Sequence, residues 1–195
     1  MKINELKKRA YDIAVKKGWY EKKLSEPHFI MLIVTELGEA VNADRENKHA
    51  DRVEFERVLN SYTDLGFDKI FEAYIKDTVE DEFADAIIRI LSFAGGNGVV
   101  LPEQMYDDQY IAEAVSVANG ACDLGELNRD VTLPEELFLI VCDLVNMDTA
   151  EYSLHETLFT LFVVAKRRGI DFKWHVEQKM KYNELRPYKH GGKKY

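Results

Sequence analysis

The chain has 195 residues, 46% of them hydrophobic, so it can bury a sizeable core and is most simply one domain. Only 4 Pro and 11 Gly interrupt it, which favours helices over a turn-rich β fold. The formal net charge of -9 argues against general binding of duplex nucleic acid.

The location that the sequence predicts is a reducing cytoplasm. Cys122 and Cys142 form neither a disulfide framework nor a CxxC site. The first residues show a charged amphipathic pattern without the apolar stretch of a signal peptide. The apolar run Phe29–Val34 is too short to span a bilayer, so we expect no membrane association.

Hydrophobic periodicity predicts an all-α helical bundle. Residues 48–77 are polar but contain helical pieces, and we expect them to form an insertion packed on the bundle. The expected helices are 2–17, 25–47, 78–94, 110–127, 134–147, 154–168 and 171–185.

An internal repeat is one interpretation of the second half. The segment Asp123-Leu124-Gly125-Glu126 echoes Glu36-Leu37-Gly38-Glu39, and the same register places Ser153 opposite Glu82 and Glu156 opposite Asp85. The chain would then be a single domain, 1–195, built as a pseudo-dimer. Its repeats would be 26–99 and 107–170, the second acid set would be degenerate, and residues 171–195 would form a C-terminal helix and basic tail.

Two pairs of acids carry the main chemical signal. Glu36 and Glu39 are three residues apart on one expected helix, and Glu82 and Asp85 are three apart on another. Glu36 lies in an apolar stripe, and the second pair is surrounded by apolar residues. Unpaired carboxylates there would be costly, whereas hard oxygen ligands suit Mg²⁺. The competing interpretation is that each pair is a solvated face or a set of salt bridges.

The expected last helix carries a second polar group. Lys179, Asn183 and Arg186 are spaced four and three residues apart, so they share one face and can bind phosphate oxygens. The alternative is a basic tail with ordinary surface charges.

These motifs resemble those of the MazG-like nucleoside triphosphate pyrophosphohydrolases, in the all-α NTP pyrophosphatase superfamily that includes the dimeric dUTPases. The matching residues are the Glu36 to Glu39 and Glu82 to Asp85 motifs and the more specific tail, 179–195. The connection from Glu39 to Glu82 is longer than in the family. The stretch Val100–Ser153 interrupts what is often a direct passage to the final helix.

The resemblance implies a helical bundle with Mg²⁺ held by Glu36, Glu39, Glu82 and Asp85. It also implies hydrolysis of a nucleoside triphosphate to the monophosphate and pyrophosphate. The sequence does not decide which acid takes the proton of water, although Glu39 is one choice. Association into a homo-oligomer is compatible with this assignment.

Two other classes remain open from the sequence. A di-iron carboxylate bundle needs Glu-x-x-His on two helices, and only Glu46-x-x-His49 fits. A non-catalytic helical protein that binds a partner would show no turnover with any nucleotide.

Overall fold

All regular structure in the part of the chain that the computed structural model describes is helical, which confirms the all-α prediction. The described residues are 2–61, 64–123, 131–146, 150–192 and 194. The elements are α1 (Ile3–Lys16), α2 (Glu26–Arg45), α3 (Arg52–Ser61), α4 (Phe67–Tyr74), α5 (Val79–Gly96), the 3-10 turn η1 (Glu103–Tyr106), α6 (Asp108–Asp123), α7 (Leu133–Asn146), α8 (Ala150–Arg167), α9 (Phe172–Leu185) and the short α10 (Lys189–Gly192).

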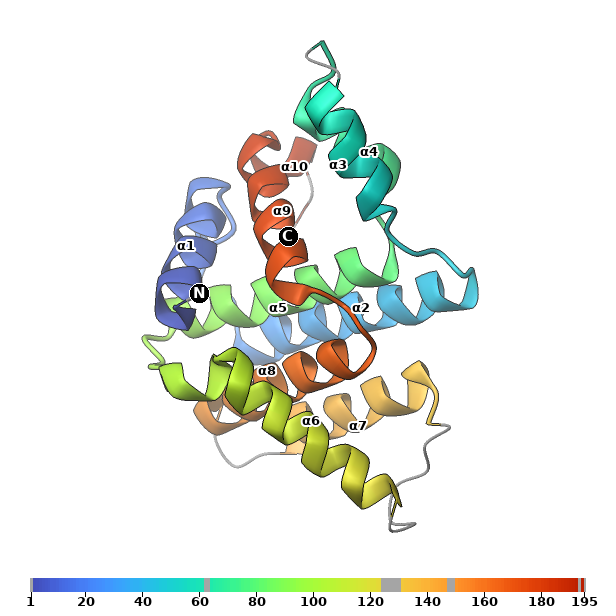
Figure 1. Ribbon diagram of the computed structural model, residues 1–195. Helices are drawn as coiled ribbons and strands as arrows, with labels where there is room; N and C mark the ends of the chain where they lie inside the picture. The colour runs from blue at the N-terminus through green and yellow to red at the C-terminus, as the bar shows by residue number, and fades with distance from the viewer. Residues whose placement is uncertain (1, 62–63, 124–130, 147–149, 193, 195) are drawn as a thin grey trace.

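Helix α5 is the centre of the molecule. It packs against α1, α2, α8 and α9, and Figure 1 shows it lying alongside α2. A helix that is apolar on nearly all sides is stable only when it is surrounded. Most residues of α5 are accordingly buried, from Val79 to Ala94. Any polar side chain on this helix therefore needs a specific partner.

Glycine determines how closely α1 approaches α5. A Cβ atom on Gly95 would lie 2.7 Å from the Cβ of Tyr11. Gly38 on α2 differs, because a Cβ there would meet no atom within 4 Å. Gly95 is therefore a packing residue, and Gly38 is not.

Helices α2, α5, α7 and α8 form the main bundle. α7 packs against both α2 and α8, and α8 also packs against α5. α6 lies on the outer side of this group, against α8 and η1 (Figure 1). The large core runs through all of these helices, including Leu37, Phe83, Leu137 and Leu158.

The arrangement bears on the proposed internal repeat. The repeat register makes 110–127 the counterpart of the Glu36 helix and 154–168 the counterpart of the Glu82 helix. α6 packs on α8 as α2 packs on α5, and α7 contacts both α2 and α8. Asp123 and Ser153 are described by their backbone only, and Glu126 lies outside the described residues. The duplication and the degenerate second acid set therefore stay predictions.

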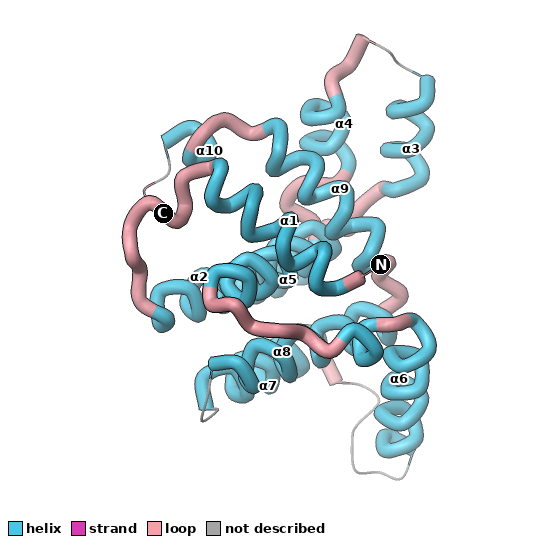
Figure 2. Tube along the Cα trace, turned by 90° about the vertical axis from the view of Figure 1, so that its left-hand side faces the viewer, coloured by secondary structure: helices cyan, strands magenta, loops and turns pink. Residues whose placement is uncertain are grey.

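The insertion forms a helical hairpin with its own small core. Figures 1 and 2 show α3 and α4 side by side, projecting from the bundle near α9. Phe55 and Phe71 are fully buried there. The ring of Tyr182 on α9 stacks on Phe71 with centroids 4.5 Å apart. Since α9 also packs on α5, the hairpin is tied to the bundle through α9.

Residues 186–192 fold back onto the end of α1 (Figure 2). The buried ammonium of Lys17 donates to the carbonyl oxygen of Glu184 at 2.8 Å and also to that of Arg186. A cation at a helix C-terminus satisfies carbonyl groups that lack partners within the helix. The backbone N–H of Lys189 donates to the carbonyl oxygen of Lys17 at 3.0 Å. The end of α9 is thereby held in place by α1.

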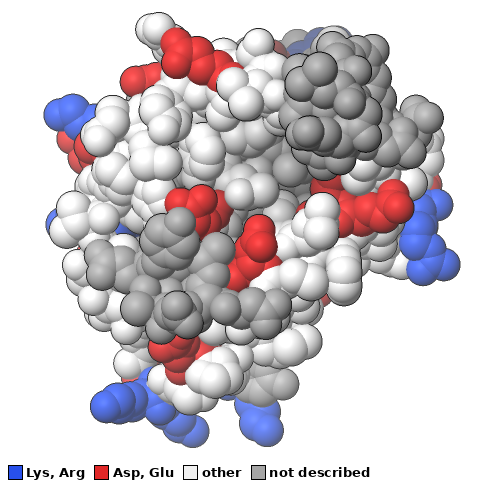
Figure 3. All heavy atoms as spheres, turned by 90° about the horizontal axis from the view of Figure 1, so that it is seen from below, with Lys and Arg blue, Asp and Glu red and all other residues white. Residues whose placement is uncertain are grey.

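The surface and the helix lengths bear on partners. None of the described helices is long and apolar enough to cross a membrane. Seen from below in Figure 3, Asp and Glu side chains lie both in the middle of the described face and at its rim, whereas Lys and Arg side chains lie at its edges.

Candidate metal centre

The first turn of α5 concentrates acids at a favourable place. The Thr78 hydroxyl caps the helix by accepting the N–H of Asp81 and donates to the carbonyl oxygen of Ile75 at 2.6 Å. Three acids follow at once: Glu80, Asp81 and Glu82. Negative side chains near a helix N-terminus interact favourably with the helix dipole, which offsets part of the cost of their burial.

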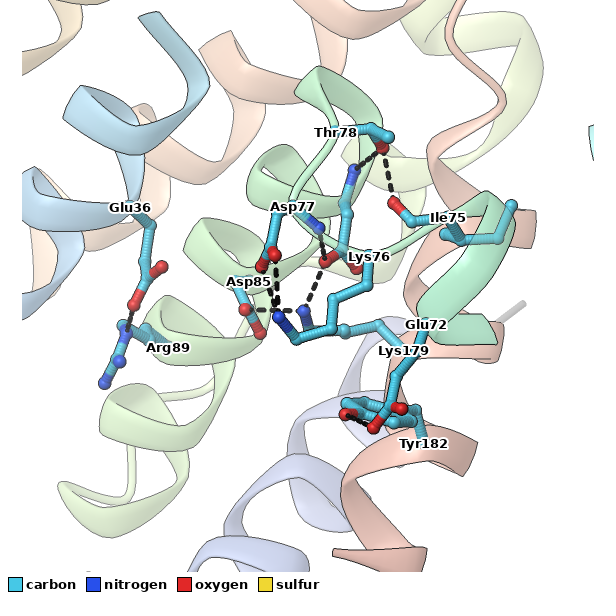
Figure 4. A network of polar contacts seen from close by, with 11 residues as sticks. Glu36, Glu72, Ile75, Lys76, Asp77, Thr78, Asp85, Arg89, Lys179 and Tyr182 are labelled. Carbon is cyan, nitrogen blue, oxygen red and sulfur yellow. Dashed lines mark hydrogen bonds and ion pairs between the residues drawn. The ribbon is translucent and has the colours of Figure 1, made fainter. Parts of the chain in front are cut away.

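Three of the four predicted acids come together. Glu36 from α2 and Glu82 and Asp85 from α5 each offer a carboxylate oxygen, and these oxygens all lie within 4.8 Å of one another. Glu36 and Glu82 are each only 4% exposed. Figure 4 shows Glu36 and Asp85 on their two neighbouring helices. The solvated-face interpretation does not describe Glu36 and Glu82, whereas the salt-bridge interpretation fits in part, because Arg89 contacts Glu36 and Lys179 contacts Asp85.

Glu39 is placed differently. It is exposed on α2, one turn beyond Glu36, and does not belong to the close group of oxygens. Its charge still acts on Glu36. Glu39 therefore borders the centre from the solvent side.

The basic side chains nearby do not offset the cost of ionising Glu36 and Glu82. Burial, with the charge of Asp85 second, raises the pKa of Glu82 to about 9. Burial and Asp85 also raise the pKa of Glu36 to about 7, although Arg89 acts in the opposite direction. Oε2 of Glu82 is buried and has no hydrogen-bond partner among the described residues. An orphaned carboxylate oxygen in an all-oxygen donor set fits a hard divalent cation such as Mg²⁺.

Two basic side chains touch the acids. Arg89 on α5 donates to Oε1 of Glu36. Nζ of Lys179 on α9 lies 2.8 Å from Oδ2 of Asp85, as Figure 4 shows. Burial alone would raise the pKa of Asp85, but Lys179 and Arg89 outweigh it, so the pKa of Asp85 lies below its usual range.

The predicted phosphate-binding residues on α9 lie beside this centre to different degrees. Lys179 is only 3% exposed and contacts acids directly. Asn183 is buried one turn later, and its Oδ1 has no partner among the described residues. Arg186 is partly exposed at the end of α9, with its guanidinium 5.6 Å from the Tyr182 ring centroid, and its charge acts on Asp85.

Asp81 is a site residue that the motif did not identify. It is 1% exposed, and its Oδ2 lies 2.6 Å from Nζ of Lys179. Asp77 and Asp81 also form a second close oxygen group with Glu82. The available signal was the acid cluster before the helix, but an all-round apolar helix does not reveal which acid turns inward.

The di-iron alternative receives no geometric support within the described residues. His49 lies after the end of α2, where its side chain is half-exposed, and its Nδ1 is 2.9 Å from Oε1 of the largely covered Glu80. The described clusters that could hold a metal contain carboxylates only.

Comparison of the chain with protein-family models, curated proteins and solved structures finds no match. The assignment of a function therefore depends on the geometry of the acids and on the motifs they belong to.

Proposed function

We propose that the protein is a Mg²⁺-dependent pyrophosphohydrolase that converts a nucleoside triphosphate or deoxynucleoside triphosphate to the monophosphate and pyrophosphate. The observation that carries the proposal is the close group formed by buried Glu36, buried Glu82 and half-buried Asp85, with an oxygen of Glu82 that has no partner among the described residues and a lysine beside Asp85. The resemblance of the two acid motifs to the MazG-like enzymes supplies the reaction.

Each residue has a proposed role. Glu36, Glu82 and Asp85 would hold Mg²⁺, which when bound supplies positive charge for the polyphosphate and makes water a better nucleophile. Glu39, at the solvent edge, would complete the metal surroundings and take the proton of the attacking water.

On α9, Lys179 and Arg186 would bind phosphate oxygens, and the buried amide of Asn183 would orient the substrate. The cytoplasm, where nucleotides are found, is the proposed location, and self-association is compatible with the exposed side chains of α7, such as Phe138 and Leu139.

The test is a screen of ribonucleotides and deoxyribonucleotides with Mg²⁺ that detects released pyrophosphate. Asp85→Asn and Glu39→Gln should each lower kcat/KM by roughly 100-fold or more while the circular dichroism spectrum is kept. Glu113→Gln makes the same charge change on the exposed face of α6 and should leave turnover intact. Near-normal turnover in both site variants would reject the assignment, and no turnover of any nucleotide by the wild type would favour the partner-binding alternative.

A further inference from the structure

The carboxylate of Asp81 is buried beside the candidate metal centre without belonging to the Glu36, Glu82 and Asp85 group. It is 1% exposed in the first turn of α5. Its Oδ2 accepts the backbone N–H of Asp77 at 3.0 Å and lies 2.6 Å from Nζ of Lys179. Its Oδ1 has no partner among the described residues. Burying a charged carboxylate is costly, so this position needs a reason beyond capping α5.

The ammonium of Lys179, the partner of Asp81, is held by contacts on several sides. Nζ of Lys179 lies 2.6 Å from Asp81 and 2.8 Å from Asp85, so it bridges the two acids. The rings of Phe71 and Tyr182 lie 5.7 and 5.9 Å from the same ammonium. A lysine side chain normally has many rotamers, and fixing one of them requires such contacts.

The two acids that hold Lys179 are not equivalent. Asp85 has an oxygen in the close group with Glu36 and Glu82, where a cation would be bound. Asp81 has no place in that group, so its contact with Lys179 remains when a cation engages Asp85. Without Asp81, the ammonium would have Asp85 as its one close carboxylate and would compete with the metal for it.

We propose that Asp81 is a positioning residue that fixes the Lys179 ammonium beside Asp85, so that it meets the phosphate oxygens of a metal-bound polyphosphate. The inference rests on the proposed function, because it assigns Lys179 to the phosphates of the substrate. It adds a residue, Asp81, that acts through Lys179 and does not touch the substrate.

If Asp81 acted on the substrate only through its charge, removing its carboxylate should strengthen the binding of a polyphosphate. Removing a carboxylate makes the surroundings less negative, which by Coulomb's law favours binding of an anionic polyphosphate. A positioning role predicts weaker binding, because Lys179 is no longer held on the phosphate side. The sign of the change therefore separates the two explanations.

The experiment titrates inorganic pyrophosphate into the protein with Mg²⁺ present, followed by calorimetry. Asp81→Asn should weaken pyrophosphate binding about 10-fold or more, the loss typical of one charge-assisted hydrogen bond. Asp12→Asn is the matched control, because Asp12 is an exposed acid on α1 that pairs with Lys8 at 2.5 Å and not with Lys179. It should leave binding unchanged or tighter. Binding by Asp81→Asn that equals or exceeds that of the wild type would overturn the proposal.

A double variant covers the case in which Asp81→Asn does not fold. Asp81→Asn combined with Lys179→Met leaves neither charge of this pair behind, so its fold should survive. It should bind pyrophosphate no more weakly than Lys179→Met alone, since Asp81 acts only through Lys179. A further 10-fold loss would overturn the proposal.

Binding of Mn²⁺ alone, measured by electron paramagnetic resonance, separates this inference from the proposed function. A wild type that binds neither Mn²⁺ nor pyrophosphate would reject both. A wild type that binds both and releases pyrophosphate from nucleotides, with Asp81→Asn unweakened, would reject only the role of Asp81.

Discussion

Replacing Glu82 by Gln tests whether the acidic centre needs a cation. Burial and Asp85 raise the pKa of Glu82 to about 9 in the folded protein, against about 4.3 for a free glutamate. A group whose folded-state pKa is raised contributes stability that is fully present below its unfolded pKa and is lost as pH rises through its folded pKa. The metal-free wild type should therefore lose stability between about pH 4.5 and 9, and a glutamine at this position removes that dependence.

The size of the effect follows from the shift. At pH 8 the wild type has lost about 5 kcal/mol of this contribution at 1.36 kcal/mol per pH unit, and at pH 5 about 1 kcal/mol. The larger value is an upper bound, because Glu36, whose pKa is raised to about 7, ionises within the same pH range and its charge acts on Glu82. At roughly 2–4 °C per kcal/mol for a chain of this size, Glu82→Gln should gain roughly 10 °C in Tm over the wild type between pH 5 and pH 8.

The assay is thermal unfolding followed by circular dichroism in EDTA at both pH values, repeated with excess Mg²⁺. Mg²⁺ should restore the wild type at pH 8 and act less on Glu82→Gln, because a ligand that binds the folded state stabilises it. Glu113→Gln, on the exposed face of α6, should follow the wild type throughout. An equal Tm difference between wild type and Glu82→Gln at pH 5 and pH 8 would refute the electrostatic reasoning for a cation.

Three further changes test the fold and the C-terminal segment. Gly38→Ala should raise the free energy of unfolding by about 0.5–1 kcal/mol in urea titrations, because a Cβ there meets no other atom. Gly95→Ala should lower the free energy of unfolding, because its Cβ would meet Tyr11. Equal effects of the two substitutions would contradict the packing of α1 on α5. Burial lowers the pKa of His175 to about 4, so its contribution to stability is present above about pH 6.5 and is lost as pH falls toward 4, by about 3 kcal/mol. His175→Gln should lack this acid loss in urea titrations at pH 7 and pH 4.5, and an unchanged pH profile would show that the imidazole is not held neutral. Truncation after Leu185 should chiefly raise KM in the pyrophosphate-release assay, and unchanged KM and kcat would make residues 186–195 purely structural.

Patterns in the sequence were enough to predict the main helices and the meeting of Glu36, Glu82 and Asp85, for a physical reason. Helical periodicity is local, and an acid inside an apolar stripe, such as Glu36, is visible without any knowledge of the partner helix. Glu39 follows three residues later and falls at the edge of that stripe, where it is exposed. Spacing alone could not distinguish the buried member of that pair from the exposed one.

The Asp81–Lys179 contact could not be predicted, because it depends on how α9 crosses α5. Both residues belong to patterns that the sequence shows, an acid cluster and a basic helix face, but 98 positions separate them. The place of α7 beside α2 is a similar case. No pattern in the sequence indicated this contact, which depends on how the apolar faces of the helices pack.

The contact between Lys17 and the end of α9 has a consequence for biosynthesis. Lys17 and Glu184, the donor and acceptor of one of these hydrogen bonds, are 167 positions apart in the chain. A contact of such high sequence separation forms late, because a long loop must close before it can form. α1 can pack on α5 before α9 is translated, and only its contact with α9 has to wait. Helices α1, α2 and α5 can pair earlier, so we expect the docking of α9 on the end of α1 to follow their association.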